Sequence, residues 1–131
     1  MRFNSLMPEL SVSNIETSKH FYLDVLGFKL EYERKEDNFV FISYGEAQIM
    51  LEQINGNWDT GTLERPFGRG VNFQIKADNV EEISKNILFA GFQLFEDIYQ
   101  VSYMENETLH SLKEFLVQDP DGYLLRFSQS L

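Results

Sequence analysis

The chain has 131 residues, of which 43% are hydrophobic, so its length and composition are typical of a single globular domain spanning 1–131. It contains no cysteine, which excludes a disulfide framework and thiol chemistry. Its 21 acidic and 11 basic residues give a net charge of −10, so we expect a phosphate backbone to be repelled and a cationic ligand to be attracted.

The first half of the chain predicts a β-α-β-β-β module over about residues 6–54. Alternating residues predict a strand at 8–12, and the capping-box pattern Ser13-x-x-Glu16 predicts the start of a helix that ends at Gly27. Three further strands are expected after this helix, at 29–34, 39–44 and 47–54.

The second half predicts the same order of elements over about residues 70–129, after a glycine-containing linker at 55–69. The pattern Asp78-x-x-Glu81 predicts the second helix start. Strands are expected at 71–75, 93–101, 112–119 and 123–128, with an irregular segment at 102–111. Neither module buries both faces of its sheet alone, so we expect the two to pack together, within one chain or across a dimer.

The last two strands are joined by Asp119-Pro120-Asp121-Gly122. Proline presets φ for the second position of a tight turn, glycine tolerates a positive φ, and aspartate side chains bond nearby backbone amides. This stretch therefore predicts a β-hairpin that completes the fold.

These two modules, with Phe21-Tyr22 and Leu26-Gly27-Phe28 in the first and Asp119-Pro120-Asp121-Gly122 near the end, resemble the vicinal-oxygen-chelate superfamily of glyoxalases, bleomycin resistance proteins and extradiol dioxygenases. The resemblance covers essentially the whole chain. It implies an α+β fold in which two tandem βαβββ modules form curved mixed sheets around a cavity, with the helices on the outer faces. It also implies that a homodimer completes the cavity.

The resemblance also locates the positions at which enzymes of this group hold a divalent metal with His and Glu. In this sequence these positions are occupied by Met7, Met50, Gly70 and Arg126. None of them is a ligand for a hard or borderline cation. The resemblance is therefore closest to the bleomycin-resistance branch and implies no metal, no cofactor and no catalytic residue.

The alternation of the strands describes the cavity face independently. If the apolar positions face the helices, the opposite faces carry amides, methionines, two acids and one base, a mixture that suits a semi-polar pocket. The helix-facing positions are then Leu10, Val12, Ile49, Leu51, Val71, Phe73, Ile75, Leu125 and Phe127. We predict a ligand-binding set of Glu9, Gln48, Met50, Glu52, Asn72, Gln74 and Arg126, together with Trp58 on the linker.

Two of these residues leave alternatives open. An enclosed Arg126 needs a carboxylate partner, for which Glu9 and Glu52 are the candidates, so it fits either a structural ion pair or a ligand contact. Trp58 is placed either to stack on a flat cation or to plug the edge of the core or the dimer seam.

Three functions compete. The favoured hypothesis is a cytoplasmic, non-catalytic protein that sequesters a cationic small molecule such as a bleomycin-type glycopeptide and so confers antibiotic resistance, with neither nucleic acid nor membrane as partner. No stretch reaches the roughly 20 apolar residues of a membrane helix. The second hypothesis is a metal-dependent lyase, transferase or dioxygenase with the displaced ligands Glu9, Gln48, Glu52 and His110. The third is a pocketed regulatory or scaffold protein.

Overall fold

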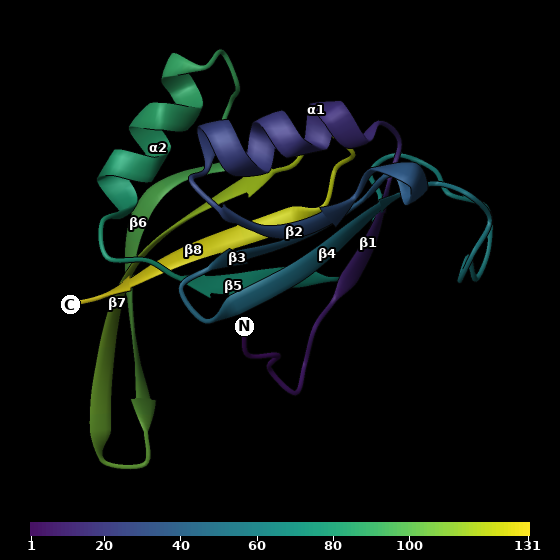
Figure 1. The fold of residues 1–131 in the computed structure, drawn as a ribbon. Helices are drawn as coiled ribbons and strands as arrows, with labels where there is room; N and C mark the ends of the chain where they lie inside the picture. The colour runs from purple at the N-terminus through teal and green to yellow at the C-terminus, as the bar shows by residue number, and fades with distance from the viewer. The chain divides into compact units, whose positions relative to one another are not determined.

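The structure, a computed structural model, describes all 131 residues, and their contacts divide them into two units. The first unit consists of Met1–Phe67 with Pro120–Gly122, and the second of Gly68–Asp119 with Tyr123–Leu131. Each unit has its own four-stranded sheet and main helix (Figure 1). No helix is long and apolar enough to span a membrane.

The first unit runs in the order strand, helix and three strands. Its elements are β1 (Glu9–Val12), α1 (Ile15–Lys19), the π-helical continuation η1 (His20–Val25), β2 (Lys29–Arg34), the 3-10 turn η2 (Lys35–Asp37), β3 (Phe39–Tyr44) and β4 (Ala47–Gln53). The sheet order is β1-β4-β3-β2, with β1 parallel to β4 and the other pairs antiparallel. Helix α1 packs against β4.

The second unit repeats this arrangement. Its elements are β5 (Asn72–Lys76), α2 (Val80–Phe89), β6 (Glu96–Glu105), β7 (Thr108–Gln118) and β8 (Leu124–Ser130). The sheet order is β5-β8-β7-β6, and α2 packs against β7 and β8. The predicted α+β fold of two βαβββ modules with mixed sheets is confirmed.

Both helices begin one residue later than predicted. The N-caps are Asn14 and Asn79 rather than Ser13 and Asp78. Each asparagine side chain accepts a hydrogen bond from the N–H three residues further on, at 3.1 Å. An amide oxygen caps as well as a hydroxyl or carboxylate, so the two adjacent polar residues were not distinguishable by type.

The last strand of each unit also holds the first residue of the helix. The Gln53 Oε1 atom accepts a hydrogen bond of 3.0 Å from the N–H of Ile15, and the Gln129 Oε1 atom accepts one of 3.0 Å from the N–H of Val80. Helix starts leave unpaired N–H groups, so one glutamine at the same place in each repeat satisfies one of them.

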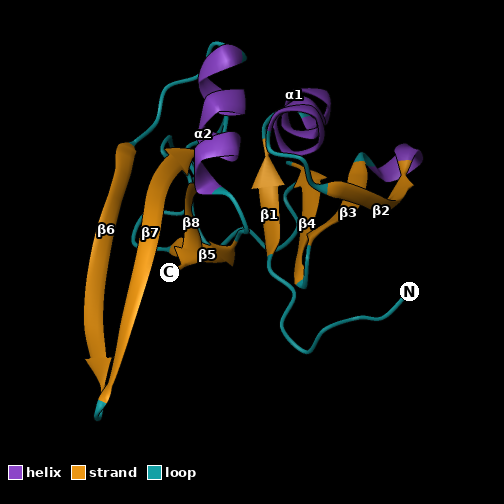
Figure 2. Cartoon of the chain, turned by 90° about the vertical axis from the view of Figure 1, so that its left-hand side faces the viewer, coloured by secondary structure: helices purple, strands orange, loops and turns teal.

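The prediction of an irregular segment at 102–111 is wrong. Strands β6 and β7 continue through it and are joined at Asn106-Glu107, where Asn106 takes the left-handed conformation with φ 55°. Figure 2 shows this hairpin extending well past β5 and β8 of its own sheet. The polar composition of the segment reflects solvent on both faces of a two-stranded ribbon rather than a loop, and His110 therefore lies on a strand.

The terminal hairpin is confirmed. The N–H of Asp119 donates to the Tyr123 carbonyl at 2.9 Å, and the Asp119 side chain accepts from the Tyr123 N–H at 3.0 Å. Asp121 has another role, because its buried carboxylate accepts hydrogen bonds from the N–H and the hydroxyl of Ser13, at 3.1 and 2.5 Å. The turn thus anchors the chain just before α1.

The helix-facing positions are also confirmed, with one exception. Val71 is 51% exposed because β5 begins only at Asn72. Phe73 is half-buried, and the remaining positions are buried: Leu10, Val12, Ile49, Leu51, Ile75, Leu125 and Phe127. The faces opposite these residues are therefore the ones that carry the predicted binding set.

Candidate functional site

Three of the predicted residues share the face of the first sheet that points away from α1. Met50 on β4 lies opposite Glu9 on β1 and Phe41 on β3, and Glu52 lies opposite Phe39. Residues two apart on a strand point the same way, so these side chains form one surface. The register brings Glu9, Met50 and Glu52 together as the alternation predicted.

The same face carries an aromatic row that the sequence analysis left out. The rings of Tyr32 and Phe41 are stacked, with centroids 5.3 Å apart and planes at 8°. The guanidinium carbon of Arg34 lies 3.9 Å from the centroid of the Phe39 ring, a cation–π contact. Phe3 meets Phe41 edge-on at 5.5 Å. Phe39 and Phe41 are themselves buried, so the parts of this row that reach solvent are Tyr32, Arg34 and Phe3, and Arg34 already holds one flat cation on the Phe39 ring.

Glu9 has an electrostatic environment that favours a second cation. Partial burial raises the pKa of its carboxyl, the negative charge of Glu52 raises it further, and Arg34 opposes both effects. Two carboxylates that repel each other on one face are both stabilised when a positive charge arrives between or beside them.

The Gln48 side chain is hydrogen-bonded to the backbone of the N-terminal segment. Its Nε2 atom donates to the Arg2 carbonyl at 2.7 Å, and its Oε1 atom accepts from the Asn4 N–H at 2.7 Å. The Asn4 side chain in turn donates to the Glu46 carbonyl. Gln48 therefore fastens the segment 1–5 to β4, and both polar ends of its amide are occupied.

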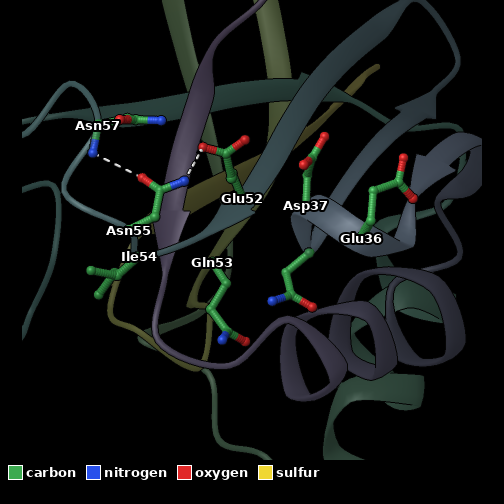
Figure 3. Close-up of a pocket in the computed structure, with 8 residues that line it drawn as sticks. Glu36, Asp37, Glu52, Gln53, Ile54, Asn55 and Asn57 are labelled. Atoms are coloured by element: carbon green, nitrogen blue, oxygen red, sulfur yellow. Dashed lines mark hydrogen bonds between the residues drawn. The ribbon is translucent and has the colours of Figure 1, made fainter.

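A pocket of about 430 Å³ opens beside this face, where β4 ends (Figure 3). It is formed by η2, by the last residues of β4 and by the segment that follows β4. Three carboxylates and four amides line it, and no basic side chain does. The lining residues are Glu36, Asp37, Asn38, Glu52, Gln53, Ile54, Asn55 and Asn57.

Hydrogen bonds fix the shape of this pocket. Glu52 accepts from the Asn55 side chain at 2.8 Å, and the Asn55 Oδ1 atom accepts from the Asn57 N–H at 2.8 Å, as the dashed lines in Figure 3 show. Asp37 accepts from the Arg34 Nε atom at 3.0 Å. Glu52 belongs to both the pocket and the aromatic face, so the two are continuous.

Trp58 follows the pocket in sequence but does not line it. Its side chain is 84% exposed and its φ is 63°. A plug of the core would be buried, so this exposure is compatible with the other two predicted roles, a stack on a flat cation or a contact at the dimer seam.

The other predicted residues belong to the second sheet. Asn72 and Gln74 on β5 lie opposite Leu124 and Arg126 on β8, and both β5 side chains are exposed. The Gln74 Nε2 atom donates to the Ser128 hydroxyl at 3.1 Å. These residues share the sheet face that points away from α2.

The centre of this second face is Glu114, which the prediction omitted. It is 2% exposed, and its carboxylate accepts hydrogen bonds from the Tyr99 hydroxyl, at 2.8 Å, and from the Ser128 hydroxyl. Burial and the hydrogen bond to Glu114 raise the pKa of Tyr99, because ionisation would place a second negative charge beside the first. The hydroxyls of Tyr99 and Ser128 thus hold the buried Glu114 carboxylate in place.

Arg126 lies beside this carboxylate. Its Nη1 atom is 3.9 Å from the Glu114 Oε1 atom, and its buried Nε atom has no hydrogen-bond partner. The carboxylate found next to Arg126 is therefore one from its own sheet. The guanidinium is oriented by charge, and its buried Nε–H group is left without an acceptor.

The four positions at which related enzymes would hold a metal do not fit one. Two are thioethers, Gly70 has no side chain, and Arg126 brings a positive charge that pairs with Glu114. Nor do His, Asp and Glu side chains elsewhere gather in a group of three or more that could hold an ion. Of the displaced set, His110 bonds Glu105 at 3.0 Å on the β6–β7 hairpin.

Only weak sequence patterns pointed to the site residues that the predicted binding set omitted. Glu114 is a lone acid before the apolar run Phe115-Leu116-Val117, and only the register of β7 shows which way it points. Glu36 and Asp37 are typical turn residues in the sequence, and only the structure shows that they line a pocket. Tyr32 lies between Glu31 and Glu33, but a β-bulge in β2 shifts its pairing with β3 between Leu30 and Tyr32. Phe39 opens the apolar run 39–42, which does not show by itself which way its ring points.

Comparison with known proteins adds an independent line. The sequence profile described as "Glyoxalase/Bleomycin resistance protein/Dioxygenase superfamily" matches residues 2–127. A lactoylglutathione lyase of Neisseria meningitidis is 29% identical over 125 residues, which cover 92% of this chain and 86% of that protein. A bleomycin resistance protein of Geobacillus stearothermophilus is 26% identical over 134 residues, covering 95% and 96%.

Solved structures share the fold. A virulence protein from Salmonella typhimurium aligns over 100% of both chains with a TM-score of 0.69 and 25% identity. TioX from Micromonospora sp. ML1 aligns over 98% of this chain and 100% of its own, with a TM-score of 0.71 and 16% identity.

Proposed function

Since this chain belongs to the glyoxalase/bleomycin resistance protein/dioxygenase superfamily, we propose that it is a non-catalytic binding protein that sequesters a cationic small molecule. The observation that carries the proposal is the pocket of about 430 Å³ with three carboxylates and no base in its lining. A similarity to bleomycin resistance proteins over 95% of the chain supports the same class of ligand.

The ligand that fits best carries both a positive charge and flat rings, as a bleomycin-type glycopeptide does. The charged group would enter the pocket, where Glu36 and Glu52 attract it, since Asp37 is already paired with Arg34. The rings would lie on the adjoining aromatic face beside Tyr32. The net charge of −10 raises the local concentration of any cation around the whole protein.

The test is a calorimetric titration of metal-free bleomycin, and separately of its copper complex, into the protein at low and moderate salt. We expect saturable binding at micromolar concentration or tighter. Glu52→Gln removes the carboxylate shared by the pocket and the aromatic face without changing its size, so the affinity should fall about five- to tenfold. Glu107→Gln at the tip of the β6–β7 hairpin makes the same charge change and should leave the affinity unchanged.

Absence of heat with both forms of the drug would overturn the bleomycin proposal. Equal losses in the two variants would show that overall charge, rather than this pocket, attracts the ligand.

One comparison favours a second function, a metal-dependent lyase, because the Neisseria relative is a lactoylglutathione lyase. That function requires about one divalent metal per chain in protein purified without chelators, measured by elemental analysis. Given the residues at the four metal positions, we expect far less.

We also infer that the protein acts as a homodimer and that it works in the cytoplasm, where a chain without cysteine suits a reducing compartment.

A further inference from the structure

Arg34 begins a row of residues that crosses the first sheet. It pairs with Phe39 across β2 and β3, and Phe39 pairs with Glu52 across β3 and β4. Directly paired residues on neighbouring strands point to the same face of a sheet, so all three lie on the face that points away from α1. The row therefore runs from the Arg34 guanidinium to the Glu52 carboxylate, which lines the pocket.

The Arg34 guanidinium occupies a small cation site beside this pocket. Its carbon atom lies 3.9 Å from the centroid of the Phe39 ring, and its Nε atom donates to the Asp37 carboxylate at 3.0 Å. The Tyr32 ring borders the same place, with its centroid 6.0 Å from that of Phe39. The hydrogen bond to Asp37, and after it one to Tyr32, outweigh desolvation and raise the pKa of the guanidinium. An aromatic ring and a carboxylate are the partners that a flat cation prefers.

Arg34 is held in this site only weakly. The side chains of Arg34 and Asp37 are 43% and 52% exposed. Ion pairs and cation–π contacts at exposed positions contribute little to stability, because water solvates the same charges. Arg34 is the last residue of β2, so its side chain can leave the site without a change in the pairing of the strands.

The buried Phe39 ring shows what the guanidinium covers. Phe39 is 2% exposed, although it lies on the face of the sheet that carries no helix. Departure of the guanidinium would uncover this ring and release the Asp37 carboxylate, which lines the pocket. Figure 3 shows the Asp37 and Glu52 side chains extending toward the same side of the pocket. The emptied site would therefore present an aromatic ring and two carboxylates to an incoming cation.

We propose that Arg34 is a built-in competitor for the ligand, and that a flat cation of the ligand takes its place on Phe39 and Asp37. The class of ligand is one with a guanidinium or amidinium group, because the group that now fills the site is planar and lies on a ring. A tetrahedral ammonium does not reproduce this contact. The inference rests on the proposed function for the place where the ligand binds, and it adds the residue that limits the affinity.

The test uses benzamidine, a flat amidinium, titrated into the protein while the backbone amide shifts are followed by NMR. Arg34→Gln removes the competing charge but keeps a polar side chain. We expect its dissociation constant for benzamidine to be about fivefold lower than that of the wild type. The control is Lys85→Gln at an exposed residue of α2, which lowers the net charge by the same one unit and should change the constant by less than about twofold.

Asp37→Asn separates occupation of the site from overall charge. In the wild type Asp37 is paired with Arg34, so its loss should change the affinity by less than about twofold. In Arg34→Gln the Asp37 carboxylate is available to the ligand, so adding Asp37→Asn should cancel most of the gain. The doubly substituted protein has the same net charge as the wild type, so this cycle does not depend on long-range attraction.

A second ligand tests the shape of the cation. Benzylamine carries the same charge on a tetrahedral ammonium, and Arg34→Gln should bind it at least about threefold more weakly than benzamidine. Equal affinity of the wild type and Arg34→Gln for benzamidine, an equal gain in Lys85→Gln, or equal binding of the two ligands overturns the proposal.

These outcomes are distinct from those of the drug titration. Tighter binding of benzamidine by Arg34→Gln, with no binding of bleomycin by any form of the protein, would support the cation site and overturn the proposed drug. Binding of bleomycin with equal affinity by the wild type and Arg34→Gln would support the proposed function and overturn the role of Arg34.

Discussion

Glu114 is 2% exposed, yet it lies on the sheet face that carries the polar residues rather than on the face beneath α2. A buried carboxylate is tolerated only when hydrogen bonds and charge replace its water shell. Tyr99 and Ser128 supply the hydrogen bonds, and Arg126 supplies the charge from 3.9 Å. The position of Arg126 therefore depends on the donors that hold Glu114.

Tyr99→Phe removes one of these donors and nothing else. We expect the free energy of unfolding in urea to fall by about 1.5–3 kcal/mol, the value typical of a hydrogen bond to a charged group. The pKa of Tyr99 is raised in the folded protein, so its contribution is complete below the unfolded value near 10 and is lost as the pH rises through the folded value. The difference between wild type and variant should therefore shrink above pH 10.

Tyr103→Phe is the control, because Tyr103 lies on the same face of β6, is 50% exposed and contacts His110 by ring stacking at 5.2 Å. It should change stability by less than about 0.5 kcal/mol at every pH. A loss as large as that of Tyr99→Phe would mean that the hydroxyl bond to Glu114 contributes nothing specific.

At the scale of the structural element, the turn between β7 and β8 is tightly constrained at Gly122. Gly122 has φ 99°, and a Cβ atom there would lie 2.6 Å from the Cα and Cβ atoms of Pro66. Gly122→Ala should lower the free energy of unfolding by about 3 kcal/mol, because backbone strain of about 1 kcal/mol is added to a clash with backbone atoms. Gly45→Ala isolates the strain, since Gly45 has φ 59° and nothing within 4 Å, and should cost about 1 kcal/mol. Similar losses in urea denaturation would contradict the clash.

This turn also shows which structural features can be predicted from the sequence and which cannot. Its residue types predict the hairpin and the positive φ of Gly122, because both are local properties, whereas the approach of Pro66 is set by a segment more than fifty residues away. The same division applies elsewhere. Alternation predicted the face that holds Glu9, Met50 and Glu52, but the β7 register that turns Glu114 onto its face is non-local.

At the scale of the whole molecule, the net charge of −10 acts on both proposals and in opposite directions. It attracts a cation to the pocket beside Glu52, but it also makes two copies of the chain repel each other as they approach.

Added salt should therefore weaken ligand binding and strengthen dimerisation. The Debye length falls from about 30 Å at 0.01 M salt to about 10 Å at 0.1 M. Added salt therefore weakens the attraction of a cationic drug and reduces the repulsion between two acidic chains. Over this range we expect the dissociation constant for metal-free bleomycin to rise severalfold in calorimetry, while the dimer dissociation constant falls severalfold in sedimentation equilibrium. Glu52→Gln should flatten the first dependence, because it removes a carboxylate from the pocket, and should change the second little, because it alters the charge of each chain by only one. A dimer that weakens with added salt would instead be held by ion pairs between the two copies.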